Sequence, residues 1–238
     1  MTATAPAPRR SRVRRALRAL SSVLIVVGAL LLIDAVLTLV WQEPLSSLYA
    51  HVRQSHLQGQ LDELERRPLA PVERKAIDRL PDATRRLEFA ARAFSRTVQP
   101  GDALGRLRIP RIGLSIVMVA GTDAAQLREG PGHYPATPLP GRHGTVAVAG
   151  HRTTYLAPFR HIDALERGDE IEVTMPYGRF SYRVDRTRIV PPTALWVTRP
   201  VGHDQIVLTA CNPLYSAAQR IVVFARLATA IPRGWAAR

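Results

Sequence analysis

Cysteine and lysine are almost absent from this chain of 238 residues, which contains one of each, Cys211 and Lys75. A single cysteine excludes an intramolecular disulfide framework and any CxxC zinc or redox site. Arginine supplies nearly all of the positive charge, and we interpret this bias as the mark of a GC-rich genome rather than a use of arginine chemistry. Internal repeats are also absent, and the composition, 46% hydrophobic and 22% charged, is that of a globular chain with room for one domain and appendages.

Signals for a metal ion or for nucleic acid are weak. His151 could share a metal with His143 or with His161, but their spacing does not favour a site, so we predict no metal and no cofactor. The net charge of +14 would suit either nucleic acid or an anionic cell-wall surface. Basic motifs with interleaved aromatic residues and zinc-finger spacings are absent, so we predict no nucleic-acid partner.

The first 41 residues have the pattern of a membrane anchor. Six arginines between Arg9 and Arg18 precede an apolar run, residues 19–41, whose only charged residue is Asp34. As a helix this run would be about 34 Å long, enough to cross a hydrocarbon core of roughly 30 Å. It is longer than the apolar core of a signal peptide, and no small-residue cleavage pattern follows it. We therefore predict a basic cytoplasmic segment at 1–18 and a retained transmembrane helix at 19–41.

The charges beside this run predict its orientation. Arginines on the N-terminal side should stay in the cytoplasm, and Trp41 suits the opposite membrane interface. The remaining chain, with 27 basic and 18 acidic residues, is then expected outside the cell membrane, where its charge suits an anionic wall. Asp34 either marks a helix–helix contact or is tolerated within a strong span, and we favour the second interpretation.

Residues 42–99 show helical spacing of apolar positions, for instance Leu57, Leu61 and Leu64. Three prolines divide the segment into short helices. We interpret it as a helical stalk or linker that lifts the following domain from the bilayer. An interaction module is the alternative, without a specific signal.

Short alternating runs predict a β domain over residues 100–230, followed by a tail at 231–238. Runs such as GTVAVAGH, DEIEVTM and DQIVLTAC are separated by Gly and Pro, which is typical of an antiparallel sandwich or barrel. The segments DAAQLREGPGHYP and APFRHIDAL look like helical turns within connections. The predicted class is all-β with short inserted helices.

Cys211 ends one of the strand-like runs, because Pro213 cannot continue a sheet ladder. A free cysteine taken alone is more often buried and inert, and a nucleophile needs a base and an oxyanion donor. His151 also follows a strand-like run, after Gly150. Arg220 begins the next run, and the short loop NPLYSAAQ would return it to the rim that carries Cys211. These three are the candidate catalytic residues, although His151 and Arg220 each have a structural alternative.

The segments AVAGHRTTYLAPF and VLTACNPLYSAAQR resemble the two signature segments of sortases, the cysteine transpeptidases of bacterial cell envelopes. The resemblance covers about residues 100–228 and the N-terminal anchor. Within it, GPGHYPATPLPGRHGTVAVAGHRTTYLAPF is most similar to class E sortases of actinobacteria. The resemblance implies an eight-stranded β-barrel, with Cys211 as the nucleophile and His151 as the acid/base partner. It also implies that Arg220 stabilises the oxyanion or holds the substrate.

The resemblance implies substrates and partners as well. The family cuts a C-terminal sorting motif, LPXTG or LAXTG in type, between Thr and Gly, and passes the acyl group to an amine. Partners would be secreted proteins with a sorting signal and the amine of a peptidoglycan precursor, lipid II, at the membrane. The family pattern has a hydroxyl residue that helps to shape the substrate site where this chain has Ala210. The candidate substrate-binding residues are Thr209, Ala210, Tyr155, Thr153 and Tyr215; for the last three, the sequence favours a structural role over contact with substrate.

Other enzyme types fit less well. L,D-Transpeptidases place His before Cys, but their Ser-His-Gly-Cys signature is absent around Cys211, and papain-like and amidase types place Cys before His. Two alternatives stay open: a pilin-polymerising sortase, and a catalytically degenerate β-domain that binds cell-wall polymer. The second would not need Cys211, His151 and Arg220 together.

Overall fold

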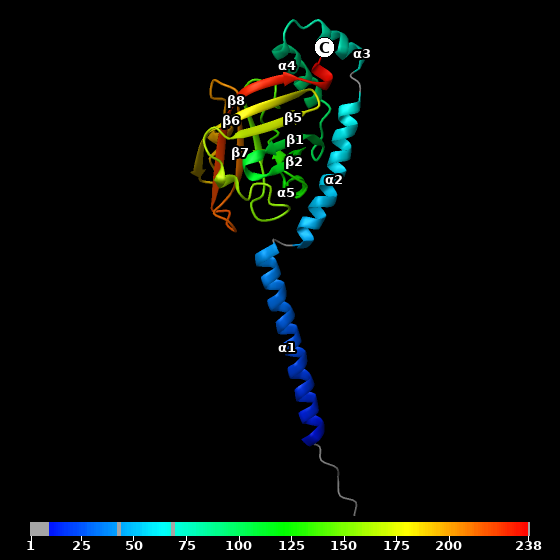
Figure 1. Cartoon of the computed structure of the whole chain (residues 1–238), viewed down its shortest axis with the longest axis vertical. Helices are drawn as coiled ribbons and strands as arrows, with labels where there is room; N and C mark the ends of the chain where they lie inside the picture. Colours follow the sequence, from blue (N-terminus) through cyan, green and yellow to red (C-terminus); the bar gives the residue numbers. More distant parts are fainter. Residues whose placement is uncertain (1–9, 42–43, 68–69, 238) are drawn as a thin grey trace, which may run out of the picture. The chain divides into compact units, whose positions relative to one another are not determined.

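The structure is a computed structural model that describes residues 10–41, 44–67 and 70–237 (Figure 1). The chain forms two compact units, Met1–Pro44 and Leu45–Arg238, and each is described by itself. Half of the predicted basic segment 1–18, the predicted helix break at Pro68 and the last residue of the predicted tail lie outside the described residues.

The first unit is a single helix, α1 (Arg10–Trp41). Within it, Arg14–Val36 is long and apolar enough to cross a membrane, by length and composition. The helix begins inside the arginine-rich segment rather than at residue 19, because arginine is itself a good helix former. The side chain of Trp41, which we expected at the interface, lies outside the described side chains.

The second unit is built on a closed barrel of eight strands, which confirms the predicted architecture (Figure 1). Around the barrel the strands follow the order β1-β2-β3-β4-β7-β8-β6-β5. Their bounds are β1 (Ala103–Ile109), β2 (Leu114–Ala120), β3 (Gly132–His133), β4 (Thr145–Ala149), β5 (Glu170–Met175), β6 (Gly178–Val190), β7 (Gln205–Asn212) and β8 (Gln219–Pro232). The connections contain α5 (Ala124–Leu127) and 3-10 helices at Pro110–Ile112, Ile162–Ala164 and Leu195–Thr198, and a further 3-10 helix, Gly234–Ala236, follows β8. The barrel is filled by inward-facing residues of the seven strands other than β3, as the sequence pattern predicts.

The shortest strand, β3, was not predicted. It lies in the segment that we expected to be only a helical turn, and that turn is present just before it as α5. Gly132 pairs in parallel with Val119 of β2 and antiparallel with Ala149 of β4. The two residues of β3 thereby join two strands that would otherwise leave the barrel open.

The predicted stalk does not stand free of the barrel. It forms α2 (Pro44–Arg66), α3 (Pro71–Asp78) and α4 (Ala83–Ser95). On α2, the buried Leu57 and Leu61 pack against the outer face of the β1–β2 pair, and on α4, Leu87 and Phe94 belong to the main core. The apolar stripes that we read as a stalk are therefore contact faces, and residues 45–99 belong to the compact unit of the barrel.

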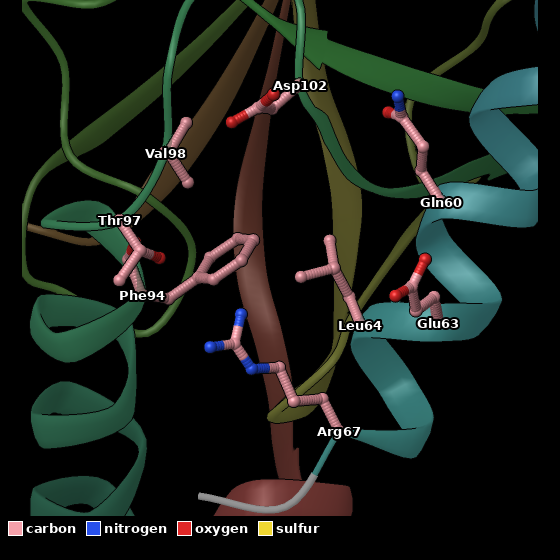
Figure 2. Close-up of a pocket in the computed structure, with 8 residues that line it drawn as sticks. All are labelled: Gln60, Glu63, Leu64, Arg67, Phe94, Thr97, Val98 and Asp102. Carbon is pink, nitrogen blue, oxygen red and sulfur yellow. The ribbon is translucent and has the colours of Figure 1, made fainter. Parts of the chain in front are cut away.

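The predicted tail is also ordered against the helices. The last strand continues to Pro232, and Trp235 stacks edge-on to Phe94 with 5.6 Å between ring centroids. The Trp235 Nε1 donates to the carbonyl of Arg67. Between α2 and α4 lies a cavity of about 260 Å³ (Figure 2). Its lining residues are Gln60, Glu63, Leu64, Arg67, Phe94, Thr97, Val98 and Asp102, none of which is a predicted site residue.

Candidate active site

Cys211 and Arg220 lie directly opposite each other on neighbouring strands. The register of β7 against β8 pairs Cys211 with Arg220, and the loop between the strands makes the return that the sequence predicted. Both side chains are half-buried. Arg220 is held by two hydrogen bonds of 2.9 Å, in which its Nη1 donates to the carbonyls of Ala217 and Gln219. Since both bonds use Nη1, the other guanidinium nitrogens can turn toward a ligand at Cys211.

Alternation along β7 decides which residues share the face of Cys211. Leu208 and Ala210 belong to the barrel core, so Thr209 and Cys211 face outward. Ala210 is buried in that core, which corrects its place among the candidate substrate-binding residues, because its side chain points away from the face of the thiol. Because Ala210 faces the core, the presence of alanine where the family pattern has a hydroxyl residue changes the packing of the barrel. Thr209, also a candidate, directs its hydroxyl to the phenol of Tyr134 at 2.9 Å.

His151 follows the strand that lies on the other side of β7. Parallel pairing sets Ala149 opposite Thr209, and the amide of Gly150 donates to the Thr209 carbonyl at 3.0 Å. The pairing ends there, and the same register continued by two residues would set His151 opposite Cys211. Gly150 is required here, since a Cβ at this position would lie 2.5 Å from the ring of Phe159. The rim of the barrel thus brings together the ends of β4, β7 and β8, and with them His151, Cys211 and Arg220.

The His151 imidazole has an aromatic and a cationic neighbour. Its ring lies 5.4 Å from that of Tyr155, and the Arg128 guanidinium lies 5.8 Å from the centre of the Tyr155 ring. Burial, and then the positive charge of Arg128, lower the pKa of His151 below its ordinary value of 6.5. The imidazole is therefore neutral at pH 7 and able to accept a proton.

Arg152 links the exits of β4 and β7. Its side chain is only 4% exposed, and its Nη1 donates to the side-chain oxygen of Asn212 at 3.0 Å. It also donates to the carbonyl of Arg160 and forms a 3.0 Å ion pair with Asp163. The residue after His151 therefore holds the residue after Cys211.

The other candidate substrate residues lie on the loops of this rim. Thr153 and Tyr155 are half-buried in the loop after His151, where Tyr155 has a left-handed φ of +49°. Tyr215, 68% exposed, lies on the loop after Cys211, and its hydroxyl accepts a long bond from Arg160 Nη2. Their contacts here are with protein groups, so their part in binding stays a prediction.

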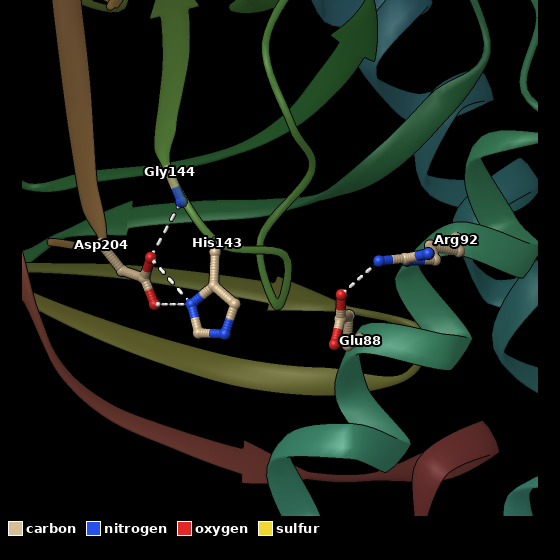
Figure 3. A network of polar contacts seen from close by, with 5 residues as sticks. All are labelled: Glu88, Arg92, His143, Gly144 and Asp204. Carbon is tan, nitrogen blue, oxygen red and sulfur yellow. Dashed lines mark hydrogen bonds and ion pairs between the residues drawn. The ribbon is translucent and has the colours of Figure 1, made fainter. Parts of the chain in front are cut away.

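The histidines that we weighed as a metal pair lie apart. His143 precedes β4 and His151 follows it, at opposite ends of the strand. The Nδ1 of His143 lies 3.1 Å from a carboxylate oxygen of Asp204, whose other oxygen accepts from the Gly144 amide (Figure 3). Across the described parts of the chain, no three histidine, cysteine, aspartate or glutamate side chains are grouped to hold a metal ion.

The family model of the sortase domain matches residues 107–228, which include the whole rim from Arg128 to Arg220. The chain belongs to the sortase family. This family consists of cysteine transpeptidases, so the match places the chain among enzymes of that type.

Known sortases of two classes are similar to this chain. Sortase D of Bacillus subtilis (strain 168) is 33% identical over 136 residues, which cover 55% of this chain and 67% of the relative. Sortase SrtE1 of Streptomyces coelicolor is 29% identical over 153 residues, 57% of this chain and 43% of the relative. The solved structure of sortase E from Streptomyces avermitilis is 33% identical, with a TM-score of 0.52, covering 56% of this chain and 93% of that chain. Class E sortases are thus among the similar proteins, as the sequence indicated.

Three residues of the site were not found from the sequence. Arg128 lies in a connection with no periodic pattern, and Arg152 and Asn212 each follow a predicted catalytic residue without a signal of their own. Adjacency in the chain was the available clue for the last two, since residues beside a reacting group often hold it in place.

Proposed function

We propose that this chain is a membrane-anchored sortase that attaches secreted proteins to the cell wall. It would cleave a C-terminal sorting motif, LAXTG or LPXTG in type, between Thr and Gly. The acyl group would pass through a thioester on Cys211 to an amine of a peptidoglycan precursor. The observation that carries the proposal is the convergence of Cys211, Arg220 and His151 at one rim, through the registers of β4, β7 and β8.

In the first half-reaction, neutral His151 takes the thiol proton as the Cys211 sulfur attacks the threonine carbonyl. The guanidinium of Arg220 donates to the oxyanion that develops on that carbonyl. The protonated His151 then gives its proton to the departing glycine nitrogen, and the carbon–nitrogen bond breaks to leave the thioester.

In the second half-reaction, the accepting amine attacks the thioester. His151, again neutral, takes a proton from the attacking nitrogen, and the Cys211 thiolate leaves as the new amide forms. The proton on His151 returns to the thiolate and restores the starting state. The lowered pKa of His151 supports this sequence, since each attack begins with a neutral base.

The anchor supports the proposed location. A helix of membrane-spanning length and composition precedes the barrel, and arginines dominate its N-terminal side. We propose a cytoplasmic N-terminus and an extracellular barrel, where the substrates and the precursor amine are found.

Incubation of the full chain in detergent with LPXTG and LAXTG peptides and an amine tests the proposal. Wild type should release the glycine-containing fragment and form the amide, and Cys211→Ala should lose at least about a thousandfold in rate. His151→Gln and Arg220→Ala should also lose activity. His161→Gln, at an exposed turn, and Arg226→Ala, exposed on β8, are the matched controls and should keep it. Equal rates in wild type and Cys211→Ala, or no reaction with either peptide, would overturn the proposed function.

A further inference from the structure

The helix α2 is tied to an open edge of the barrel by one side-chain amide. The Val117 amide donates to Gln54 Oε1 at 2.9 Å, and Gln54 Nε2 donates to the Val117 carbonyl at 3.0 Å. The side chain of Gln54 thus pairs with Val117 as a neighbouring strand residue would. This edge of β2 is free at Val117 because β3 pairs only with Val119 and Ala120, two and three positions further along β2.

The same amide reaches the connection between α5 and β3. Gln54 Nε2 donates to the Glu129 carbonyl at 2.7 Å, and Arg53 lies 3.8 Å from the Glu129 carboxylate. The next residue, Gly130, is closely enclosed, since a Cβ there would lie 2.5 Å from Gln54 Nε2 and 2.8 Å from the Val117 carbonyl. Two consecutive residues of the connection are therefore clamped between α2 and β2.

Arg128 comes directly before this clamp and directly beside the catalytic rim. Its guanidinium stands over the Tyr155 ring, which in turn contacts the His151 ring. Arg128 is exposed, and its place is therefore set by the backbone that carries it together with the cation–π contact. A chain of contacts runs from α2 through Gln54, Glu129 and Arg128 to Tyr155 and His151.

We propose that Arg128 is a positioning residue for His151, acting through Tyr155, and that Gln54 of α2 holds Arg128 in place. The inference rests on the proposed function, in which His151 is the acid and base. The inference gives α2 a role in catalysis, because the packing of this helix against the barrel determines where the Arg128 guanidinium and the Tyr155 ring lie beside the His151 imidazole.

Several charged or titratable groups lie on the elements that meet at this rim, and the ring of Tyr155 contacts that of His151. Arg128 comes from the α5 side, Cys211 from β7, Arg220 from β8 and Tyr155 from the same loop as His151. Arg152 is directed instead to Asn212 and Asp163. Substitutions at Arg128 and Gln54 remove none of the other groups, so a change in the titration of His151 reports the proposed contact chain.

The test compares Gln54→Met with Gln60→Met in the full chain in detergent. Both glutamines lie on α2, but Gln60 contacts β1, through a 3.4 Å bond from the Ala103 amide, and not the connection that bears Arg128. Titration of the His151 ring by NMR, with its signal assigned from His151→Gln, should show a higher pKa in Gln54→Met and in Arg128→Gln. Loss of a neighbouring cation stabilises the imidazolium, which gives this direction. Gln60→Met should titrate as wild type does.

Kinetics supply the second readout. The kcat/KM for peptide cleavage should fall by about tenfold in Gln54→Met and Arg128→Gln, with the acid limb of the pH profile moved upward. The double variant should lose no more than the larger single loss, because both changes break one chain of contacts. If Gln54→Met fails to fold, Arg128→Gln still tests the effect of Arg128 on His151, because Arg128 is at an exposed position and its replacement should not prevent folding.

An unchanged His151 titration in Arg128→Gln overturns the inference, as does an equal effect of Gln54→Met and Gln60→Met. The NMR titration requires no turnover, so it can support or overturn the inference even if wild type cleaves neither peptide. Failure of the proposed function is seen separately, as equal rates in wild type and Cys211→Ala.

Discussion

The residues that follow the candidate nucleophile and base carry polar contacts that fix the rim. Arg152 spans from the exit of β4 to Asn212 at the exit of β7, and Asn212 Nδ2 reaches Gln219 Oε1 beside Arg220. Each of the three strands that bring the site together is thereby connected to the next by a side chain. At the scale of residues, the rim is held by groups that do no chemistry themselves.

Replacement of Arg152 by methionine should loosen this rim. The change removes a nearly buried guanidinium and leaves the Asn212 side-chain oxygen and the Arg160 carbonyl without their donor, at a cost of roughly 2 kcal/mol or more in unfolding free energy. Chemical denaturation measures this loss, and peptide cleavage should slow with it. Arg111→Met is the control: Arg111, which pairs with Glu166 and Asp169, is itself exposed to solvent, so the change should cost less than about 1 kcal/mol. Equal costs in the two variants would contradict the role given to Arg152.

His133 should make the fold sensitive to acid. Burial lowers its pKa to about 4, against the opposing effect of a 3.1 Å hydrogen bond to the Pro138 carbonyl. Between about pH 6.5 and pH 4 the unfolded chain binds a proton that the folded chain does not, so stability falls as the pH falls, by roughly 3 kcal/mol over the whole window. The free energy of unfolding of His133→Gln, measured between pH 8 and 5, should decrease less steeply with acid than that of wild type. His151 contributes in the same direction, so some dependence should remain, and identical curves would refute this role of His133.

At the scale of elements, the sequence predicts what each segment prefers locally but not what it packs against. Alternation identifies seven of the barrel strands, because their inward residues are apolar and their neighbours are not. The strand β3 has too few residues to show a period, and its pairing is imposed by Val119 and Ala149 from distant segments. Likewise, the stripe of α2 predicts a helix, but the β1–β2 surface that receives it exists only after the strands pair. The same limit applies to the site: strand ends indicate His151, Cys211 and Arg220, whereas Arg128 reaches them only through tertiary structure.

Removal of residues 1–99 should therefore destabilise the barrel. Such a fragment, residues 100–238, would expose core surface that Leu87 and Phe94 cover, and the outer face that Leu57 and Leu61 cover. Loss of large buried apolar side chains costs about 2–5 kcal/mol each, so the loss of these four together is as large as the whole stability of an ordinary domain. The fragment 45–238 should melt cooperatively in circular dichroism, while 100–238 should bind a hydrophobic dye and lack a transition. Similar melting curves for the two fragments would show that the helices are appendages after all.

At the scale of the whole molecule, a helix with an arginine-rich start and an apolar remainder precedes the unit that holds all the candidate catalytic residues. The chain has only one cysteine, and that cysteine is the candidate nucleophile at the rim of the barrel. A single thiol label therefore reports the side of the membrane on which the barrel lies. This property makes the proposed topology directly measurable without altering the natural chain.

A membrane-impermeant maleimide applied to intact cells should label wild type and not Cys211→Ala. The positive charges at the N-terminal end of α1 favour a cytoplasmic N-terminus, so the half-buried Cys211 should meet the reagent from outside. Ser11→Cys in the Cys211→Ala background provides the opposite control, since it should react only after the cells are permeabilised. Wild-type protein in detergent should also react, which separates an inaccessible compartment from an unreactive thiol. Labelling of Cys211 only after permeabilisation would place the barrel in the cytoplasm, away from cell-wall substrates. That result would contradict the proposed attachment of proteins to the wall, but it would not contradict the proposed chemistry of the rim residues.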